Sequence, residues 1–153
     1  MEATNDPHYF EFDLDSGIRD QVVNKLESSP QLPLAKSIGP QNSGIYALYY
    51  RRSLVYIGKA SRETTKSNRT LRQRLNEHHT KISGRQNISA TDVTCRYLTF
   101  SSEWWVFAAE FALIAHYKPE WNASGFGSKV PGKGRPGTEC TSVWDAQFPE
   151  RLL

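Results

Sequence analysis

Hydrophobic positions in the first quarter of the chain predict one helix and then an irregular segment. Apolar residues recur at helical spacing from Ile18 to Leu26, so a helix is expected over residues 16–28, with Ser16 as its N-cap. The next residues, 29–43, contain three prolines, and we expect them to form an irregular connection.

Two short runs of apolar and aromatic residues then predict a β-hairpin. Residues 44–50 and 54–58 each have the length and composition of a strand. The three residues between them, Arg51, Arg52 and Ser53, predict a tight turn.

The second half of the chain predicts helix, strand and helix in turn. Residues 60–69 are polar and basic and are expected to form a loop. Apolar and polar residues alternate well enough over residues 93–100 to predict a third strand. A helix is expected from residue 103 to about residue 117. Another helix is expected over residues 70–82, with one face formed by Leu71, Leu75, His78 and Ile82.

The chain closes with a segment that has few pattern signals. Ser101 or Ser102 is expected to cap the last long helix, which should end before Pro119. Residues 122–137 are rich in glycine, proline and basic residues, and residues 142–153 are expected to form a short closing segment.

These elements together predict an α+β fold with a small three-stranded antiparallel sheet flanked by helices. An N-terminal helix precedes this β-β-α-β-α core, and a long loop region follows it. We expect a single domain over residues 1–153, divided into an N-terminal helix and connection (1–43), a core (44–122) and a closing region (123–153).

Length and composition exclude several classes of protein. No apolar run approaches the roughly 18–20 residues that cross a bilayer. Residues 1–10 have neither the basic nor the apolar part of a signal peptide. Only Cys95 and Cys140 are present, without the spacing of a zinc site or a disulfide framework. We therefore expect a protein of the reducing cytosol, such as the bacterial cytosol or nucleoid, with no membrane contact.

Charge is distributed unevenly along the chain. The formal net charge is only +3, but residues 1–20 hold six acidic residues and one basic residue. Residues 51–85 hold ten Lys or Arg and two Glu, a net charge of +8. Most runs of charged residues are simply solvated surface. An excess of positive charge this large favours a polyanionic partner instead.

Glu110 is the one ionisable residue among residues 104–115. The helix around it is apolar on nearly all sides, and a buried carboxylate is costly unless it is paired or bound to a metal ion. Two interpretations stay open: Glu110 faces water on a partly exposed helix, or it has a functional partner.

Two further pairs of residues are candidates for chemistry. Arg74 and His78 are four apart on one predicted helix, so their side chains project together. A histidine on an apolar face is more often a packed core residue, but the neighbouring arginine makes a phosphate site plausible. Tyr46 and Tyr56 lie on the two hairpin strands, where tyrosine is common and usually structural.

Taken together, these residues resemble the GIY-YIG nuclease superfamily. The tripeptides GIY (44–46) and YIG (56–58) are nine residues apart, and Arg74, Glu110 and Asn122 follow in the order of the superfamily. The resemblance covers about half of the chain.

One branch of the superfamily is particularly similar. The spacing of Arg74 and His78 resembles the type II restriction endonucleases, in which histidine occupies a position that is often tyrosine elsewhere. Residues 125–127, 131–135 and 144–145 also resemble that branch.

The resemblance implies hydrolysis of a DNA phosphodiester with one divalent metal ion. Glu110 would bind Mg²⁺, for which Mn²⁺ is a substitute, and Arg74 would contact the scissile phosphate. Tyr46 would act as general base. Its ordinary pKa of about 10 is too high for that role, and we expect Lys59 to lower it.

Three more residues have implied roles in the same site. Tyr56 would orient water or phosphate, and His78 would share or relay the proton. Asn122 would position a side chain or a backbone segment near the metal ion. The sequence leaves open which side chain accepts the proton of the attacking water: Tyr46, Tyr56 or His78.

The chain has no room for a separate DNA-binding domain, so its own loops are expected to recognise double-stranded DNA. A double-strand cut at a palindrome is most simply made by a two-fold homodimer. The restriction branch implies a cognate methyltransferase and suggests a GC-rich site. The candidate DNA-binding residues in the two basic loops are Arg62, Lys66, Arg69, Lys129, Lys133 and Arg135.

Three alternatives compete with a restriction enzyme. A structure-selective nuclease of repair or recombination would have the same catalytic residues but would cleave flaps or junctions. A DNA-binding module without catalysis would need a defect in geometry that the sequence does not show. A purely structural α+β protein would leave Glu110 unexplained.

Overall fold

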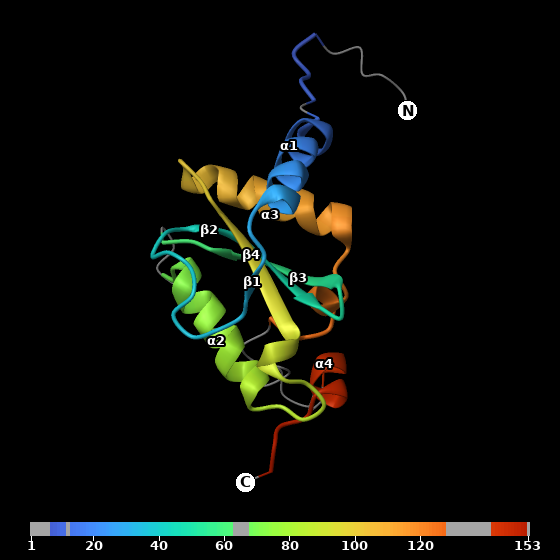
Figure 1. The fold of residues 1–153 in the computed structure, drawn as a ribbon. Helices are drawn as coiled ribbons and strands as arrows, with labels where there is room; N and C mark the ends of the chain where they lie inside the picture. The colour runs from blue at the N-terminus through green and yellow to red at the C-terminus, as the bar shows by residue number, and fades with distance from the viewer. Residues whose placement is uncertain (1–6, 12, 63–67, 128–141, 153) are drawn as a thin grey trace.

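The computed structural model describes residues 7–11, 13–62, 68–127 and 142–152. Within them, one antiparallel sheet of four strands in the order β1-β4-β2-β3 separates two layers of helices (Figure 1). The strands are β1 (Leu32–Pro33), β2 (Gly44–Tyr50), β3 (Ser53–Ala60) and β4 (Val93–Thr99).

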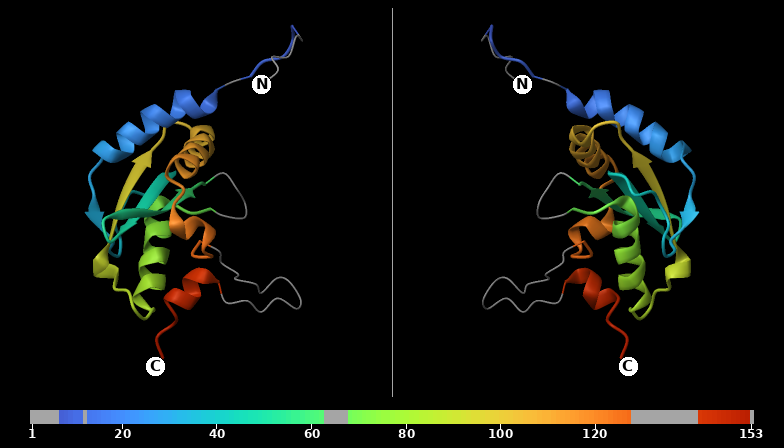
Figure 2. Two further views of the ribbon diagram at one scale, coloured as in Figure 1. Left: turned by 90° about the vertical axis from the view of Figure 1, so that its right-hand side faces the viewer. Right: turned by 90° about the vertical axis from the view of Figure 1, so that its left-hand side faces the viewer.

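Helices cover both faces of the sheet. Figure 2 shows α1 and α3 on one side of the sheet, and α2 and α4 on the other. The helices are α1 (Leu14–Ser28), α2 (Leu71–Ser83), α3 (Glu103–Tyr117) and α4 (Val143–Gln147), with short 3₁₀ turns η1 (Ala90–Asp92) and η2 (Glu120–Ala123).

The α+β fold class and the main elements are confirmed, with small differences at their ends. Helix α1 begins two residues before the predicted start because Asp13 Oδ1, rather than Ser16, caps it by accepting the Ser16 N–H at 3.1 Å. Thr70 caps α2 in a reciprocal box with Gln73, and Ser102 caps α3.

The fourth strand, β1, lies in the segment that was expected to be irregular. It pairs with β4 through Leu32 opposite Cys95 and Pro33 opposite Thr94. A two-residue strand has no alternating pattern, and a proline is tolerated at a sheet edge. No signal in the sequence therefore indicates this strand.

The two faces of the hairpin belong to two separate cores, because side chains alternate along a strand. Ile45 and Ala47 pack in the core beneath α1 and α3, whereas Tyr46 and Leu48 pack in the core beneath α2. Gly44 is required where β2 crosses β4, because a Cβ atom there would overlap the carbonyl oxygen of Leu98. The β2–β3 hairpin is thus buried on both sides, and it forms the base of the site described below.

None of the helices in the described ranges is long and apolar enough to cross a membrane.

The hairpin turn between β2 and β3 holds its backbone in an unfavourable conformation. Arg51 and Arg52 have φ angles of 51° and 65°, and both are exposed. Two successive positive φ angles define the turn that fits the twist of a hairpin, and Asn-Gly is its preferred sequence. Side chains other than Asn, Asp and Gly are strained there.

Replacing Arg51-Arg52 by Asn-Gly should therefore raise the free energy of unfolding by about 1 kcal/mol. Urea denaturation measures the change. The double variant with Gln at both positions removes the same two charges and keeps the strain, so it should match the parent protein. A gain in the Gln variant as large as in the Asn-Gly variant would assign the effect to charge instead.

Candidate active site

A group of polar side chains surrounds the free edge of the sheet at β3. Residues from four elements meet there, from both faces of the sheet: Tyr46 on β2, Tyr56 and Lys59 on β3, Arg74 and His78 on α2, and Glu110 on α3. The structure therefore brings together six of the seven residues expected to be catalytic, and the seventh, Asn122, contacts the same edge.

Tyr46 and His78 form the most buried contact of the group. Tyr46 Oη lies 2.6 Å from His78 Nε2, and both side chains are almost wholly enclosed. Gly58 stands directly opposite Tyr46 in the β2–β3 register, and a Cβ atom on Gly58 would overlap the phenol ring. The glycine of the YIG tripeptide is therefore what lets Tyr46 lie flat across the sheet and reach α2.

Aromatic rings hold His78 in place. Its ring stacks on Phe126 with centroids 4.8 Å apart and an interplanar angle of 22°, and it meets Tyr56 edge-on at 5.3 Å. Burial, together with the charges of Arg74 and Lys81, lowers the pKa of His78 to about 3. The imidazole is therefore neutral at physiological pH.

The two tyrosines keep their protons in this state of the protein. Burial raises the pKa of Tyr46 well above its ordinary value, and it also raises the pKa of Tyr56. Arg74 is the cation that lowers both pKa values, but burial outweighs it. Lys59, expected to lower the pKa of Tyr46, faces Glu110 instead.

Glu110 is half-buried, so it is not simply a solvated surface residue. Burial raises its pKa, while Lys59 and Arg74 lower it. Lys59 Nζ lies 3.5 Å from Glu110 Oε1 and 3.9 Å from the centroid of the Phe107 ring. The charge of Glu110 in turn raises the pKa of both tyrosines, so these groups act on one another across the edge strand.

Arg74 has a buried donor that nothing in the described part of the chain uses. Its Nε atom is inaccessible to solvent and lacks a hydrogen-bond partner there. Its ion pair with Glu77 is a long contact, 3.5 Å from Nη1 to Oε2. An unsatisfied buried N–H is costly, and a guanidinium suits the oxygens of a phosphate. The arrangement favours binding of an anion.

The residues around Glu110 suit one kind of metal ion better than others. In the described ranges no three His, Cys, Asp or Glu side chains gather as a metal-binding cluster. One partly desolvated carboxylate leaves most ligand positions to water and substrate oxygens. Mg²⁺ tolerates that arrangement, because it usually keeps several waters and takes one or two carboxylates. A Zn²⁺ site would need more protein ligands.

Asn122 fixes the edge strand of the sheet. Its Oδ1 accepts the Ile57 N–H at 2.9 Å, and its Nδ2 donates to the Ile57 carbonyl at 2.8 Å. The amide thus imitates a neighbouring strand at the residue between Tyr56 and Gly58. These two hydrogen bonds hold the backbone of β3 at Ile57.

The segment after Asn122 closes the site, which the sequence pattern does not predict. Phe126 stacks on His78, and Gly127 has no room for a Cβ atom because the Tyr56 hydroxyl occupies that space. Lys81 donates to the Phe126 carbonyl at 2.5 Å. The glycine-rich composition is the available signal, although composition alone indicates DNA contact rather than packing against the site.

Only two of the six candidate DNA-binding residues lie in the described part of the chain. Arg62 is exposed, and Arg69 is partly exposed with its Nε donating to Glu77. Lys66, Lys129, Lys133 and Arg135 lie outside the described residues.

Part of the basic segment has a structural task instead. Arg85 pairs with Asp145 at 2.8 Å and so attaches α4 to the turn that follows α2. Arg72 donates to the Gly39 carbonyl at 2.9 Å. The net charge of residues 51–85 therefore overstates the number of cations available to a ligand.

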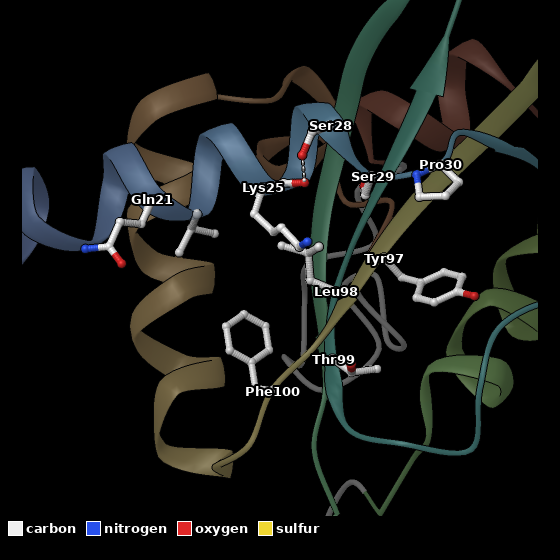
Figure 3. Close-up of a pocket in the computed structure, with 10 residues that line it drawn as sticks. Gln21, Lys25, Ser28, Ser29, Pro30, Tyr97, Leu98, Thr99 and Phe100 are labelled. Carbon is white, nitrogen blue, oxygen red and sulfur yellow. Dashed lines mark hydrogen bonds between the residues drawn. The ribbon is translucent and has the colours of Figure 1, made fainter.

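A cavity of about 390 Å³ lies elsewhere, between α1 and β4. Figure 3 shows Gln21, Lys25 and Ser28 of α1 on one side of it, and Tyr97, Leu98 and Thr99 of β4 on the other. Its lining contains no carboxylate and no imidazole. Lys25 and Tyr97 are its titratable side chains, and it lacks the carboxylates or imidazoles that usually hold a metal ion.

Comparison with known proteins identifies a family. The family model described as "Eco29kI GIY-YIG domain" matches residues 52–153. Among solved structures, the chain is similar to the GIY-YIG N-terminal endonuclease domain of UvrC from Thermotoga maritima bound to magnesium, with 21% identity, coverage of 67% of this chain and 97% of that chain, and a TM-score of 0.39. A point mutant of the same domain gives 19% identity, the same coverage and a TM-score of 0.40. No curated protein matched the chain.

The packing of Gly58 against Tyr46 can be tested by adding one methyl group. Gly58→Ala should lower the free energy of unfolding by about 1–3 kcal/mol, because the methyl group displaces the Tyr46 ring. Gly17→Ala is the control, since a Cβ atom there meets nothing within 4 Å. In helix α1 that change should stabilise the protein by about 0.5–1 kcal/mol. Equal effects of the two variants in urea denaturation would contradict the assigned packing.

The protonation state of His78 predicts a pH dependence. Its pKa is about 3 in the folded protein and about 6.5 in the unfolded chain, so the unfolded chain binds the proton first as pH falls. This histidine should leave stability unaffected above pH 6.5 and reduce it by up to about 1.4 kcal/mol per pH unit below that. In NMR titrations the His78 ring signals should not move between pH 7 and pH 5. A midpoint near pH 6.5 would contradict the burial and charge described.

Proposed function

Because the chain belongs to the Eco29kI GIY-YIG domain family, we propose that it is a type II restriction endonuclease that hydrolyses phosphodiester bonds of double-stranded DNA. The observation that carries the proposal is the meeting of Glu110, Arg74 and the hydrogen-bonded pair Tyr46–His78 at one strand edge. These groups supply what such a reaction needs: a metal ligand, an anion-binding donor and a route for a proton.

Glu110 is the residue that would hold the metal ion, with water and phosphate oxygens as the other ligands. Bound Mg²⁺, or Mn²⁺ in its place, would neutralise charge on the phosphate and on the leaving oxygen. Lys59 favours the ionised form of the Glu110 carboxylate in the free protein through their 3.5 Å contact.

Arg74 would bind the scissile phosphate. Its buried Nε atom is a donor in need of an acceptor, and a phosphate oxygen meets that need. Charge that develops on the phosphate in the transition state would strengthen this hydrogen bond, which is how a fixed donor speeds such a reaction.

Tyr46 and His78 would together take up the proton that the attacking water loses. Tyr46 is enclosed in the free protein, so the attacking water would reach Tyr46 Oη once substrate binding opens that side of the site. The water would give up its proton to that oxygen while Tyr46 passes its own proton to His78 Nε2, 2.6 Å away. This relay avoids a free phenolate, which burial of Tyr46 makes costly. Because the charge of Arg74 holds down the pKa of His78, a phosphate bound at Arg74 would make His78 a better acceptor.

Two residues, Tyr56 and Asn122, would hold other groups of the site in position. The Tyr56 ring lies beside Tyr46 and His78, with ring centroids 6.1 Å and 5.3 Å away, so its hydroxyl would orient water or phosphate. Asn122 would hold the Tyr56–Gly58 strand in place through its two hydrogen bonds to Ile57.

Recognition of DNA would come from the loops that flank the edge strand. The proposed DNA-binding residues remain Arg62, Lys66, Arg69, Lys129, Lys133 and Arg135. A homodimer on a palindromic, GC-rich site is the simplest arrangement for a double-strand cut. A cognate methyltransferase would protect the host's own DNA.

Replacing Glu110 by Gln should abolish DNA cleavage, by at least about 1000-fold, because the neutral amide holds Mg²⁺ poorly. Binding to DNA in the absence of metal should stay within about threefold, because the basic loops are unchanged. Glu120→Gln, an exposed carboxylate on η2, is the matched control and should cleave like the parent protein.

Plasmid cleavage with Mg²⁺ measures the effect and also tests the substrate class. The parent protein should give discrete fragments that end at one sequence. Cleavage of flaps or junctions regardless of sequence would favour a structure-selective nuclease, and binding without cleavage would favour an inactive module. Metal-dependent cleavage by the Glu110→Gln variant would overturn the role of Glu110.

A further inference from the structure

An exposed group of aromatic side chains lies on α3, beside Glu110. Trp104, Phe107 and Phe111 project from one side of the helix with exposed fractions of 65%, 45% and 68%. Trp105, 45% exposed, meets Trp104 edge-on with ring centroids 5.0 Å apart. We call these four residues the α3 aromatic face.

In the described part of the chain, the α3 aromatic face belongs to neither hydrophobic core, and its contact with Lys59 involves Phe107 alone. The opposite side of the helix already contributes Val106, Ala109 and Leu113 to the core beneath α1. The sequence pattern alone could not show this, because α3 is apolar on nearly all sides. Large aromatic side chains left in water are costly, so their presence indicates a partner surface.

The size and composition of the face suit a second copy of the same chain. At their exposures, four aromatic side chains present on the order of 450 Å² of surface. Two copies would together bury about 900 Å² through these side chains alone, close to the roughly 1,000 Å² that a specific interface needs. Neighbouring residues would add to this. The four residues themselves carry no charge, although Lys59 Nζ lies against the Phe107 ring at the border of the face, and aromatic residues are typical of interface centres.

We propose that the α3 aromatic face is the homodimer interface, with the two α3 helices packed antiparallel about a two-fold axis. Phe107 of each copy would then lie opposite Phe111 of the other. The proposal rests on the proposed function, since it supplies the two active sites that a double-strand cut requires.

Antiparallel packing of the two helices would let both active sites face the same DNA duplex. Successive helix residues are about 100° apart, so Glu110 lies to one side of the face that Phe111 centres. The two-fold axis that relates two antiparallel helices is perpendicular to the helices and to the line that joins them. It therefore runs along the direction in which Glu110 projects, and rotation about it leaves that direction unchanged. Both Glu110 side chains would therefore point to the same side of the dimer, toward one DNA duplex. Parallel packing would point them in opposite directions.

The first test is the mass of the full chain in solution. Analytical ultracentrifugation of the parent protein without DNA should give twice the chain mass at micromolar concentration. Phe111→Glu should raise the dissociation constant of the dimer at least 100-fold, because it places two carboxylates in an apolar interface. Val143→Glu is the control: it adds the same charge at a residue that is 71% exposed on α4, and the dimer should persist.

The second test is the pattern of plasmid cuts. The parent protein and Val143→Glu should linearise supercoiled plasmid, whereas any cuts made by Phe111→Glu should be single-strand nicks. Circular dichroism should show that Phe111→Glu is folded. If the parent protein is a dimer but never cleaves, the interface stands and the proposed function fails.

Two results would overturn the interface. The first is double-strand cleavage by a parent protein that is monomeric both free and on DNA. The second is a Phe111→Glu chain that stays dimeric but binds DNA more weakly, which would make the face a DNA contact. Orientation has its own measurement: in a Cys140→Ser background, a mixture of Phe107→Cys and Phe111→Cys chains should form more disulfide-linked dimer than either alone. Equal or greater linkage within each single variant would contradict antiparallel packing.

Discussion

The site depends first on the close approach of Tyr46 to Gly58 across the β2–β3 pair. The absence of a side chain at Gly58 lets the Tyr46 ring extend under α2, where its hydroxyl meets His78. Asn122 holds the same strand from its outer edge through Ile57. A two-stranded element buried on both faces thus fixes the position of the hydroxyl, and the helices bring charge to it.

The charges of the site balance in a way that leaves room for substrate and metal ion. In the free protein, Tyr46 and His78 are neutral, and Lys59 compensates Glu110. Arg74 keeps an unused buried donor within the described part of the chain. An anion at Arg74 would satisfy that donor, and its negative charge would attract a cation to Glu110, so binding of one favours binding of the other.

The sequence indicated which residues meet at the site better than it indicated what surrounds them. Glu110 was a candidate because one charge in a long apolar run needs an explanation. Tyr46 and Tyr56 were candidates because they stand in the GIY and YIG tripeptides, since the hairpin pattern alone favoured a structural role for them. The buried side of α3 was not predictable, since an all-apolar helix has no polar face to orient it. Contacts set by tertiary structure, such as Lys59 with Glu110 and Phe126 on His78, leave no periodic signal in the sequence.

The central claim is that Glu110 holds the catalytic metal ion at this strand edge. Electron paramagnetic resonance of Mn²⁺ titrated into the protein, with a non-cleavable DNA present, measures that binding without relying on activity. The account predicts one bound Mn²⁺ per chain in the parent protein and loss of that site in Glu110→Gln. An unchanged number of bound Mn²⁺ ions and unchanged affinity in Glu110→Gln would contradict it.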